Sequence, residues 1–185
     1  MNQKLTTKRI AMAGLLAALT TVGSWMRIVI PVSIGGNSAF HLGNIFCALS
    51  GILLGPGLGG LAAGLGSALY DMTNPIYISE CWLTFLMKGA YGVAAGLVVR
   101  HLKCGDYLRD LLSTVAGATT YAVLYLGKKY LETLIVGGVT ASGAMVAVVS
   151  RLPATLFNMA VAIIIAPILS TAIRKALELN HISLN

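Results

Sequence analysis

The longest stretch of the chain without charge lies between His41 and Asp71. No Lys, Arg, His, Asp or Glu occurs at the 29 positions between them, and Leu, Ala and Gly predominate. A Gly55-Pro56-Gly57 break near the middle of this stretch marks a tight turn. The pattern therefore predicts two short apolar helices folded back on each other. Because polar residues gather at both ends of the stretch, such a hairpin would bring two polar clusters to the same side.

Apolar runs separated by polar breaks continue along the rest of the chain. A membrane-spanning helix needs about 20 mostly apolar residues, and the chain has room for six short ones. Loops are expected at Ser33–Asn37, after Pro31 ends the first helix, and at Met72–Glu80, whereas Lys128–Met145 has the pattern of an amphipathic connector. We predict an all-α integral membrane bundle, a single transmembrane domain over residues 1–185, with spans at about 10–30, 41–54, 58–70, 82–99, 110–127 and 153–173.

Composition supports a membrane protein. The chain is 57% hydrophobic and 10% charged, with a mean hydropathy of +0.83, whereas about a quarter of the residues of a soluble domain are charged. The net charge of +7 does not indicate nucleic acid, because no basic run interleaved with aromatic residues occurs. Membrane proteins instead keep Lys and Arg on cytoplasmic loops.

The distribution of basic residues predicts the orientation of the bundle. With six spans, both termini share a side with the loop at Arg100–Arg109. That side holds eight of the thirteen Lys and Arg residues: Lys4, Lys8, Arg9, Arg100, Lys103, Arg109, Arg174 and Lys175. We therefore expect both termini to be cytoplasmic, with the polar loops at 31–40, 72–81 and 128–145 facing outward.

Ionisable and amide side chains at the outer ends of the spans are candidates for binding a small molecule. Such residues are costly inside a membrane and usually serve a function. Lys88 lies well inside its span, two helical turns from Glu80, and the alternative role is a structural partner for Asp71 or Glu80 between helices. His41 and Asn44 share a helix face; capping by His41 and interhelical hydrogen bonding by Asn44 are the alternatives.

Aromatic residues and two further polar residues complete the candidate binding set. Tyr121 and Tyr125 lie four residues apart on one face and would form a side wall for a planar ligand. Tyr77 occupies the polar loop before the fourth span. All three also suit an interfacial aromatic belt. Arg151 and Asn158 are seven apart on the last span, and Asn158, surrounded by apolar residues, needs a partner in either a ligand or a helix.

Motifs for enzyme chemistry are missing from the sequence. It contains no His-Glu-x-x-His, Cys-x-x-Cys, Gly-x-Ser-x-Gly or nucleotide-binding motif. No series of carboxylates crosses the predicted spans, which argues against an ion-driven pump. The sequence therefore predicts neither an enzyme nor a bound cofactor or metal.

Several short motifs, in this order and spacing, resemble the substrate-binding S component of energy-coupling factor (ECF) vitamin transporters, most closely the riboflavin-transporter-type branch. The resemblance covers nearly the whole chain. The motifs are Thr6-Thr7-Lys8-Arg9-Ile10-Ala11, Phe40-His41-Leu42-Gly43-Asn44, Leu54-Gly55-Pro56, Tyr70-Asp71, Lys88-Gly89 with Gly92 and Gly96, Arg151-Leu152-Pro153-Ala154, Asn158 and Ala166-Pro167.

The resemblance implies partners and a transport cycle. Such proteins lie in prokaryotic cell membranes, bind one vitamin or precursor from outside, and dock on a membrane scaffold subunit with two ATPase subunits that hydrolyse ATP. Docking is thought to topple the S component, so that its site faces the cytoplasm. The family's docking motif, Ala-x-x-x-Ala, maps to Ala13 and Ala17, with Gly14 and Ala18 beside them. Packing within the bundle is the alternative role for these small residues.

The sequence is compatible with more than one class of substrate. The mixed polar wall suits a small heteroaromatic compound, such as a pyridine or pyrimidine vitamin precursor, and a carboxylate-bearing vitamin facing Lys88 or Arg151 is an alternative. A bulky flavin would require more aromatic surface. The main alternative function is a stand-alone secondary transporter of a small solute, which would need a coupling-ion site within one bundle.

Overall fold

A computed structural model describes residues 5–31 and 37–182 of the chain. The described part forms seven α-helices, one short 3₁₀ helix and one two-stranded antiparallel sheet. The expected loop at 33–36 and Lys4 lie outside the described residues. The elements are α1 (Thr7–Trp25), β1 (Arg27–Pro31), β2 (Asn37–His41), α2 (Gly43–Leu54), α3 (Pro56–Met72), η1 (Ile78–Glu80), α4 (Cys81–His101), α5 (Asp106–Ile135), α6 (Ala141–Val149) and α7 (Leu152–Leu179).

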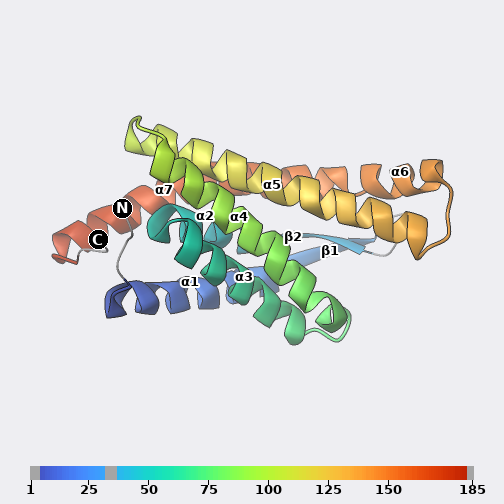
Figure 1. Ribbon diagram of the computed structural model, residues 1–185, viewed down its shortest axis with the longest axis horizontal. Helices are drawn as coiled ribbons and strands as arrows, with labels where there is room; N and C mark the ends of the chain where they lie inside the picture. The colour runs from blue at the N-terminus through green and yellow to red at the C-terminus, as the bar shows by residue number, and fades with distance from the viewer. Residues whose placement is uncertain (1–4, 32–36, 183–185) are drawn as a thin grey trace.

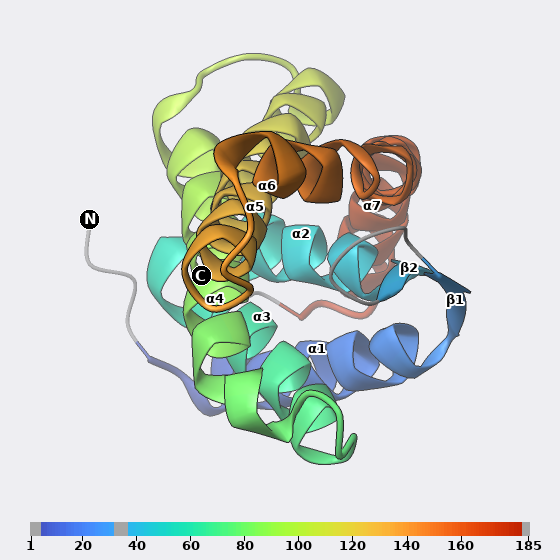
Figure 2. The same cartoon turned by 90° about the vertical axis from the view of Figure 1, so that its right-hand side faces the viewer.

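The helices form an elongated bundle whose two ends differ (Figure 1). The start of α1, the α4–α5 loop and the end of α7 lie at one end, on the left of the view, so the two terminal helices begin and end on the same side as predicted. The β1–β2 hairpin, the α3–α4 connection and α6 lie toward the other end. Seen along the long axis, the hairpin lies between α1 and α7 at the edge of the bundle (Figure 2).

The predicted helical hairpin over 41–71 is present as α2 and α3, which pack against each other. Gly55 alone makes the turn, with φ at +79°, a conformation that costs glycine little because it has no Cβ. Pro56 is the first residue of α3, where its missing N–H leaves no helical hydrogen bond unmade. The break in the sequence therefore acts as expected, although the turn is shorter than the three residues, 55–57, between the predicted spans.

The β-hairpin corrects the expectation for the first span. The apolar pattern predicts a helix running to Ile30, but α1 ends at Trp25 and Arg27–Pro31 pairs with Asn37–His41, with Arg27 opposite His41. The Ile28-Val29-Ile30 run explains the error, because a short apolar run of β-branched residues suits a helix or a strand equally well by periodicity. Helix α2 accordingly begins at Gly43 instead of His41.

Two other boundaries differ from the prediction. Helix α5 continues to Ile135 and α6 begins at Ala141, so helices occupy most of the region expected as a connector between 128 and 145. The 30 residues of α5 span about 45 Å, which exceeds the roughly 30 Å hydrocarbon thickness of a bilayer. The last turns of α5, including Lys128 and Glu132, therefore extend beyond the membrane core.

Helices α3 and α4 approach closely through glycines. A Cβ at Gly92 would lie 2.7 Å from the Gly59 carbonyl oxygen, and one at Gly96 would lie 2.4 Å from the Pro56 nitrogen. Only glycine fits such contacts, which is how helices associate closely in a bilayer. The contact fixes α4, which carries Lys88, against the α2–α3 hairpin.

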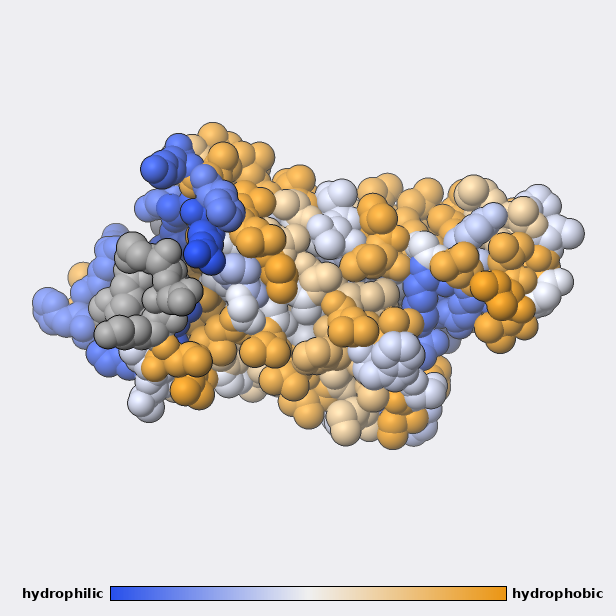
Figure 3. Space-filling model, viewed as in Figure 1, coloured by the Kyte–Doolittle hydropathy of each residue, from blue (hydrophilic) through white to orange (hydrophobic). Residues whose placement is uncertain are grey.

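Two helical stretches in the described part of the chain are long and apolar enough to cross a membrane by length and composition, Ile78–His101 and Ala141–Leu179. Helices α2 and α3 fall short because of their length, 12 and 17 residues. The surface nevertheless has apolar side chains over its middle, with hydrophilic residues toward both ends (Figure 3).

A buried charge cluster, defined by Asp110, Ser170, Arg174 and Arg109, ties α5 to α7 near the end with the termini. Asp110 is fully buried and accepts hydrogen bonds from Ser170 Oγ at 2.7 Å and Arg174 Nη2 at 3.1 Å. Arg109 Nε lies 3.6 Å from the same carboxylate. Asp110 therefore has two basic partners and a hydroxyl donor.

Helix α1 distributes its small residues over two faces. Ala13 is buried, and Ala17 is half-buried, with its carbonyl oxygen 2.3 Å from the position a Cβ would take at Gly66 of α3. Gly14 and Ala18 are exposed, and nothing lies within 4 Å of a Cβ placed at Gly14. The alternative role, packing within the bundle, thus describes Ala13 and Ala17, whereas Gly14 and Ala18 form a smooth outer face.

Candidate functional site

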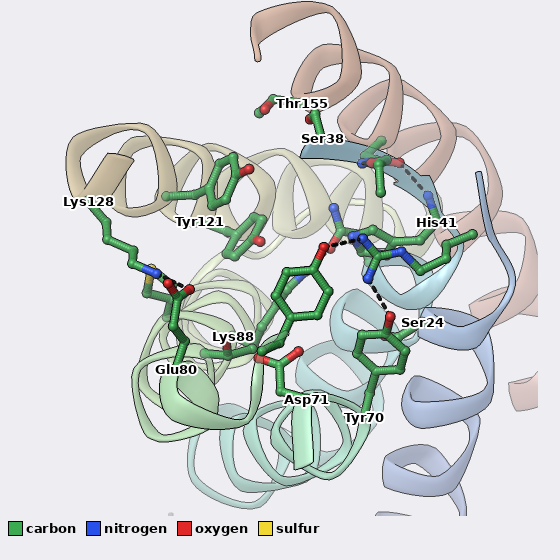
Figure 4. Close-up of a pocket in the computed structure, with 18 of the residues that line it drawn as sticks. Ser24, Ser38, His41, Tyr70, Asp71, Glu80, Lys88, Tyr121, Lys128 and Thr155 are labelled. Carbon is green, nitrogen blue, oxygen red and sulfur yellow. Dashed lines mark hydrogen bonds and ion pairs between the residues drawn. The ribbon is translucent and has the colours of Figure 1, made fainter. Parts of the chain in front are cut away.

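A cavity of about 150 Å³ lies among the hairpin, the α3–α4 connection and helices α4, α5 and α7. Its walls come from segments far apart in the sequence (Figure 4). It is lined by Ser24, Arg27, Asn37, Ser38, Ala39, His41, Asn44, Tyr70, Asp71, Tyr77, Glu80, Thr84, Met87, Lys88, Tyr121, Tyr125, Lys128, Lys129, Thr155, Asn158 and Met159. Most of these side chains are polar or aromatic, and ionisable residues inside a membrane bundle are costly and usually mark a functional site.

Lys88 occupies the deep side of the cavity, and only 4% of its surface is exposed. Its Nζ donates a hydrogen bond to Asn44 Oδ1 and lies 3.8 Å from the centre of the Tyr121 ring. Both contacts suit an ammonium group, since the face of an aromatic ring attracts a cation. Among the described residues no carboxylate lies within 4.0 Å of Lys88.

Arg27, at the start of β1, forms a second cationic centre. Its guanidinium donates hydrogen bonds to the hydroxyls of Tyr70 and Tyr77, the latter at 3.0 Å, and lies 4.9 Å from the centre of the Tyr77 ring. These contacts join the hairpin to α3 and to the loop before α4. Arg27 Nε is buried and has no hydrogen-bond partner in the described part of the chain.

Asn158 holds the other strand of the hairpin. Its Oδ1 accepts the backbone N–H of His41 at 3.0 Å, and its Nδ2 donates to the Ala39 carbonyl at 2.8 Å. The Asn158 amide therefore hydrogen-bonds to the backbone of β2. This contact supplies the partner that the sequence predicts a polar side chain in apolar surroundings to need. His41 Nδ1, in contrast, is buried without a partner among the described residues.

Tyr121 and Tyr125 form the wall expected from their spacing. Their rings stack with centres 5.7 Å apart and an angle of 19° between planes. Arg151 lies behind this wall: its Nη1 donates to the Ala147 carbonyl at 2.7 Å, and its side chain interacts with Tyr125. Arg151 is fully buried and does not line the cavity.

A four-residue rim, defined by Glu80, Lys128, Lys129 and Glu132, bridges the α3–α4 connection and the end of α5. Lys128 contacts Glu80, and Lys129 Nζ lies 2.8 Å from Glu132 Oε2. Partial burial acts to raise the pKa of Glu132, but the hydrogen bond from Lys129 and the nearby positive charges outweigh it and lower that pKa. The two carboxylates of the rim balance its two lysines.

The structure brings together nine of the ten residues predicted from the sequence: His41, Asn44, Asp71, Tyr77, Glu80, Lys88, Tyr121, Tyr125 and Asn158 all line the cavity, and Arg151 does not. The alternative of a direct pair between Lys88 and a carboxylate is not found in the described part of the chain. Sequence reasoning missed Arg27 and Tyr70 as cavity residues. The sequence signal that could have identified Arg27 is its position directly after an apolar helix.

An all-α bundle with an apolar middle and a polar cavity near one end is the architecture of a membrane protein that binds a small solute. The family described as ECF-type riboflavin transporter, S component, matches residues 4–175. The chain belongs to this family of helical, membrane-embedded, substrate-binding transporter subunits. Such subunits are not enzymes, because ATP hydrolysis occurs in the partner ATPases, and the prediction of a non-enzymatic function is confirmed.

Two relatives are also similar to the chain. An uncharacterized protein in the gap 3′ region of Pyrococcus woesei is 35% identical over 113 residues, covering 61% of the chain and 72% of that protein. A UPF0397 protein of Streptococcus gordonii is 29% identical over 127 residues, and the match covers 64% of the chain and 66% of the Streptococcus protein. The chain thus spans just under two thirds of the second relative.

Proposed function

We propose that this chain is the high-affinity binding subunit of an ATP-driven ECF importer for a vitamin or vitamin precursor. The observation that carries the proposal is the polar, aromatic-walled cavity within a membrane-embedded bundle of this family. Residues from the hairpin, the α3–α4 connection and helices α1, α2, α3, α4, α5 and α7 all line it. A site assembled in this way is suited to holding a solute and to releasing it when one wall moves.

The proposed placement is a multi-pass protein of a prokaryotic plasma membrane. Helices α1, α2, α3, α4, α5 and α7 would provide six spans, with α6 lying near the outer surface. Under this arrangement the end that carries both termini and the basic α4–α5 loop faces the cytoplasm. The cavity then opens to the outside, where a scarce nutrient is captured.

The proposed docking surface for the scaffold subunit is the outer face of α1 at Gly14 and Ala18. Exposed small residues four apart allow a partner helix to approach closely, and this face is open. Two ATPase subunits would bind the scaffold and drive toppling of this chain toward the cytoplasm. Ala13 and Ala17 would support this surface from inside the bundle.

The test pairs two double variants of α1. Replacing Gly14 and Ala18 with Leu should abolish co-purification with the scaffold and ATPase subunits and reduce ATP-dependent uptake to background, while the isolated chain keeps its thermal midpoint. Replacing Ala13 and Ala17 with Leu should instead lower that midpoint, because both contact the bundle. ATP-dependent uptake that survives the Gly14 and Ala18 change would contradict the docking surface.

A second measurement separates the importer from a stand-alone secondary transporter. Vesicles containing only this chain should show no uptake of solute down an ion gradient, whereas vesicles with the scaffold and ATPases should show uptake that requires ATP. Gradient-driven uptake by the chain alone would overturn the proposed function.

A further inference from the structure

The positive charges of the ionisable side chains around the cavity outnumber the negative charges. The rim lysines, Lys128 and Lys129, are matched by Glu80 and Glu132. Of the other ionisable lining residues, Arg27 and Lys88 are cationic and Asp71 is the one carboxylate. With neutral His41, the lining set and its rim partners carry one excess positive charge. Arg151, behind Tyr125, adds another positive charge to this side of the bundle.

The excess charge is centred on Lys88. The Arg27 guanidinium is already engaged by two tyrosine hydroxyls, whereas Lys88 has an amide oxygen and a ring face for partners. Asp71 lies beyond 4.0 Å from Lys88 and interacts with the Thr84 side chain. A buried cation without a close counter-ion is costly, and an anionic group entering the cavity would relieve that cost.

The cavity also limits the size and shape of its ligand. At about 150 Å³, it lies below the roughly 300–1,000 Å³ of sites for drug-sized ligands. The stacked Tyr121 and Tyr125 rings offer one extended wall on which a flat ring can lie. These dimensions favour one aromatic ring over the three fused rings and ribityl chain of riboflavin.

Building on the proposed function, we propose that this site takes a small, single-ring aromatic compound carrying one carboxylate, and that the carboxylate pairs with Lys88. Asn44 positions the lysine, and Tyr121 contributes both to holding the ammonium group and to the wall beside the ring. Lys88 is thereby the residue that sets specificity for an acid over its neutral analogue.

The test compares matched acids and neutral analogues on the purified full-length chain. The panel pairs nicotinate with nicotinamide and orotate with uracil, and includes riboflavin. We expect an acid to raise the thermal midpoint and to bind at least tenfold more tightly than its neutral partner, because only the acid neutralises Lys88. Lys88→Met should abolish this preference, and the control Lys103→Met, at an exposed position, should retain it.

The ligand-free protein gives an independent readout. If Lys88 is an uncompensated cation, Lys88→Met should leave the thermal midpoint of the empty protein unchanged or raise it, whereas a structural lysine would give a lower midpoint. A lower midpoint, or a panel in which no acid binds better than its neutral partner, overturns the inference. Tight binding of riboflavin that survives Lys88→Met would also overturn it, yet would leave the proposed importer function intact.

Discussion

Two buried charged clusters, one at each end of the bundle, are built in opposite ways. At the end with the termini, Asp110 is enclosed by Ser170, Arg174 and Arg109, so its charge is fully matched. In the cavity, Lys88 contacts an amide and an aromatic ring and no carboxylate within 4.0 Å among the described residues. The first cluster joins α5 to α7, whereas under the inference above the second leaves a cation that can pair with an anionic ligand.

The largest change in stability is expected from a substitution in the buried charge cluster around Asp110. Asp110→Asn removes the buried carboxylate from Arg109 and Arg174, which keep only the exposed Asp106 as an acidic partner, and breaking a buried pair costs about 3 kcal/mol. Thermal or denaturant unfolding of the purified chain should show a clear drop in stability. The control Asp106→Asn, one turn earlier with its side chain 75% exposed, should change little. If the two variants behaved alike, the Asp110 cluster would not be structural.

An intermediate effect is expected at the cavity wall. Tyr121→Leu removes part of the aromatic wall of the cavity, on which an aromatic ligand would stack under the proposed function, a contact worth about 1–1.5 kcal/mol. Ligand affinity measured by calorimetry should fall roughly tenfold by that conversion. Tyr107→Leu, near the start of the same helix and exposed, is the matched control. Unchanged affinity in the Tyr121 variant would remove this ring from the site.

The smallest effect is expected at the rim and depends on pH. The folded-state pKa of Glu132 lies below its ordinary value of 4.5, so its contribution to stability is present above that value and is lost as pH falls through the folded-state pKa. Since 37% of the Glu132 side chain is exposed and solvent screens its ion pairs, the contribution is under about 1 kcal/mol. The difference in thermal midpoint between wild type and Glu132→Gln should therefore shrink on acidification below pH 4.5. A difference that grew on acidification would contradict a lowered pKa of Glu132 in the folded protein.

Sequence predicted the cavity better than it predicted the hairpin that covers it. The cavity residues between 41 and 88 could be predicted from the sequence. An uncharged run with a Gly-Pro-Gly break predicts a helical hairpin, and the hairpin places both of its polar ends on the same side. The strand at Arg27–Pro31 could not be predicted, because Ile-Val-Ile has the same apolar pattern in a strand as in a membrane helix. Arg27 was missed for that reason, because it is the first residue of β1.

Helical spacing also has limits that Arg151 and α1 illustrate. Seven residues place Arg151 and Asn158 on one face, yet Arg151 precedes α7 and turns toward Ala147 and Tyr125. On α1, the Ala13–Ala17 and Gly14–Ala18 pairs have the same four-residue period, and only tertiary packing decides which pair faces α3. Periodicity identifies faces, and the neighbouring elements determine which face is buried.

The shortness of α2 bears on the distance a solute must travel. Asn44 and Lys88 mark the deep side of the cavity at the start of this helix, and its 12 residues extend only about 18 Å to the turn at Gly55. A bilayer core is about 30 Å thick. Under the proposed orientation, a solute that reaches Asn44 has already passed more than a third of the thickness of the membrane core, and a single short helix separates it from the other side.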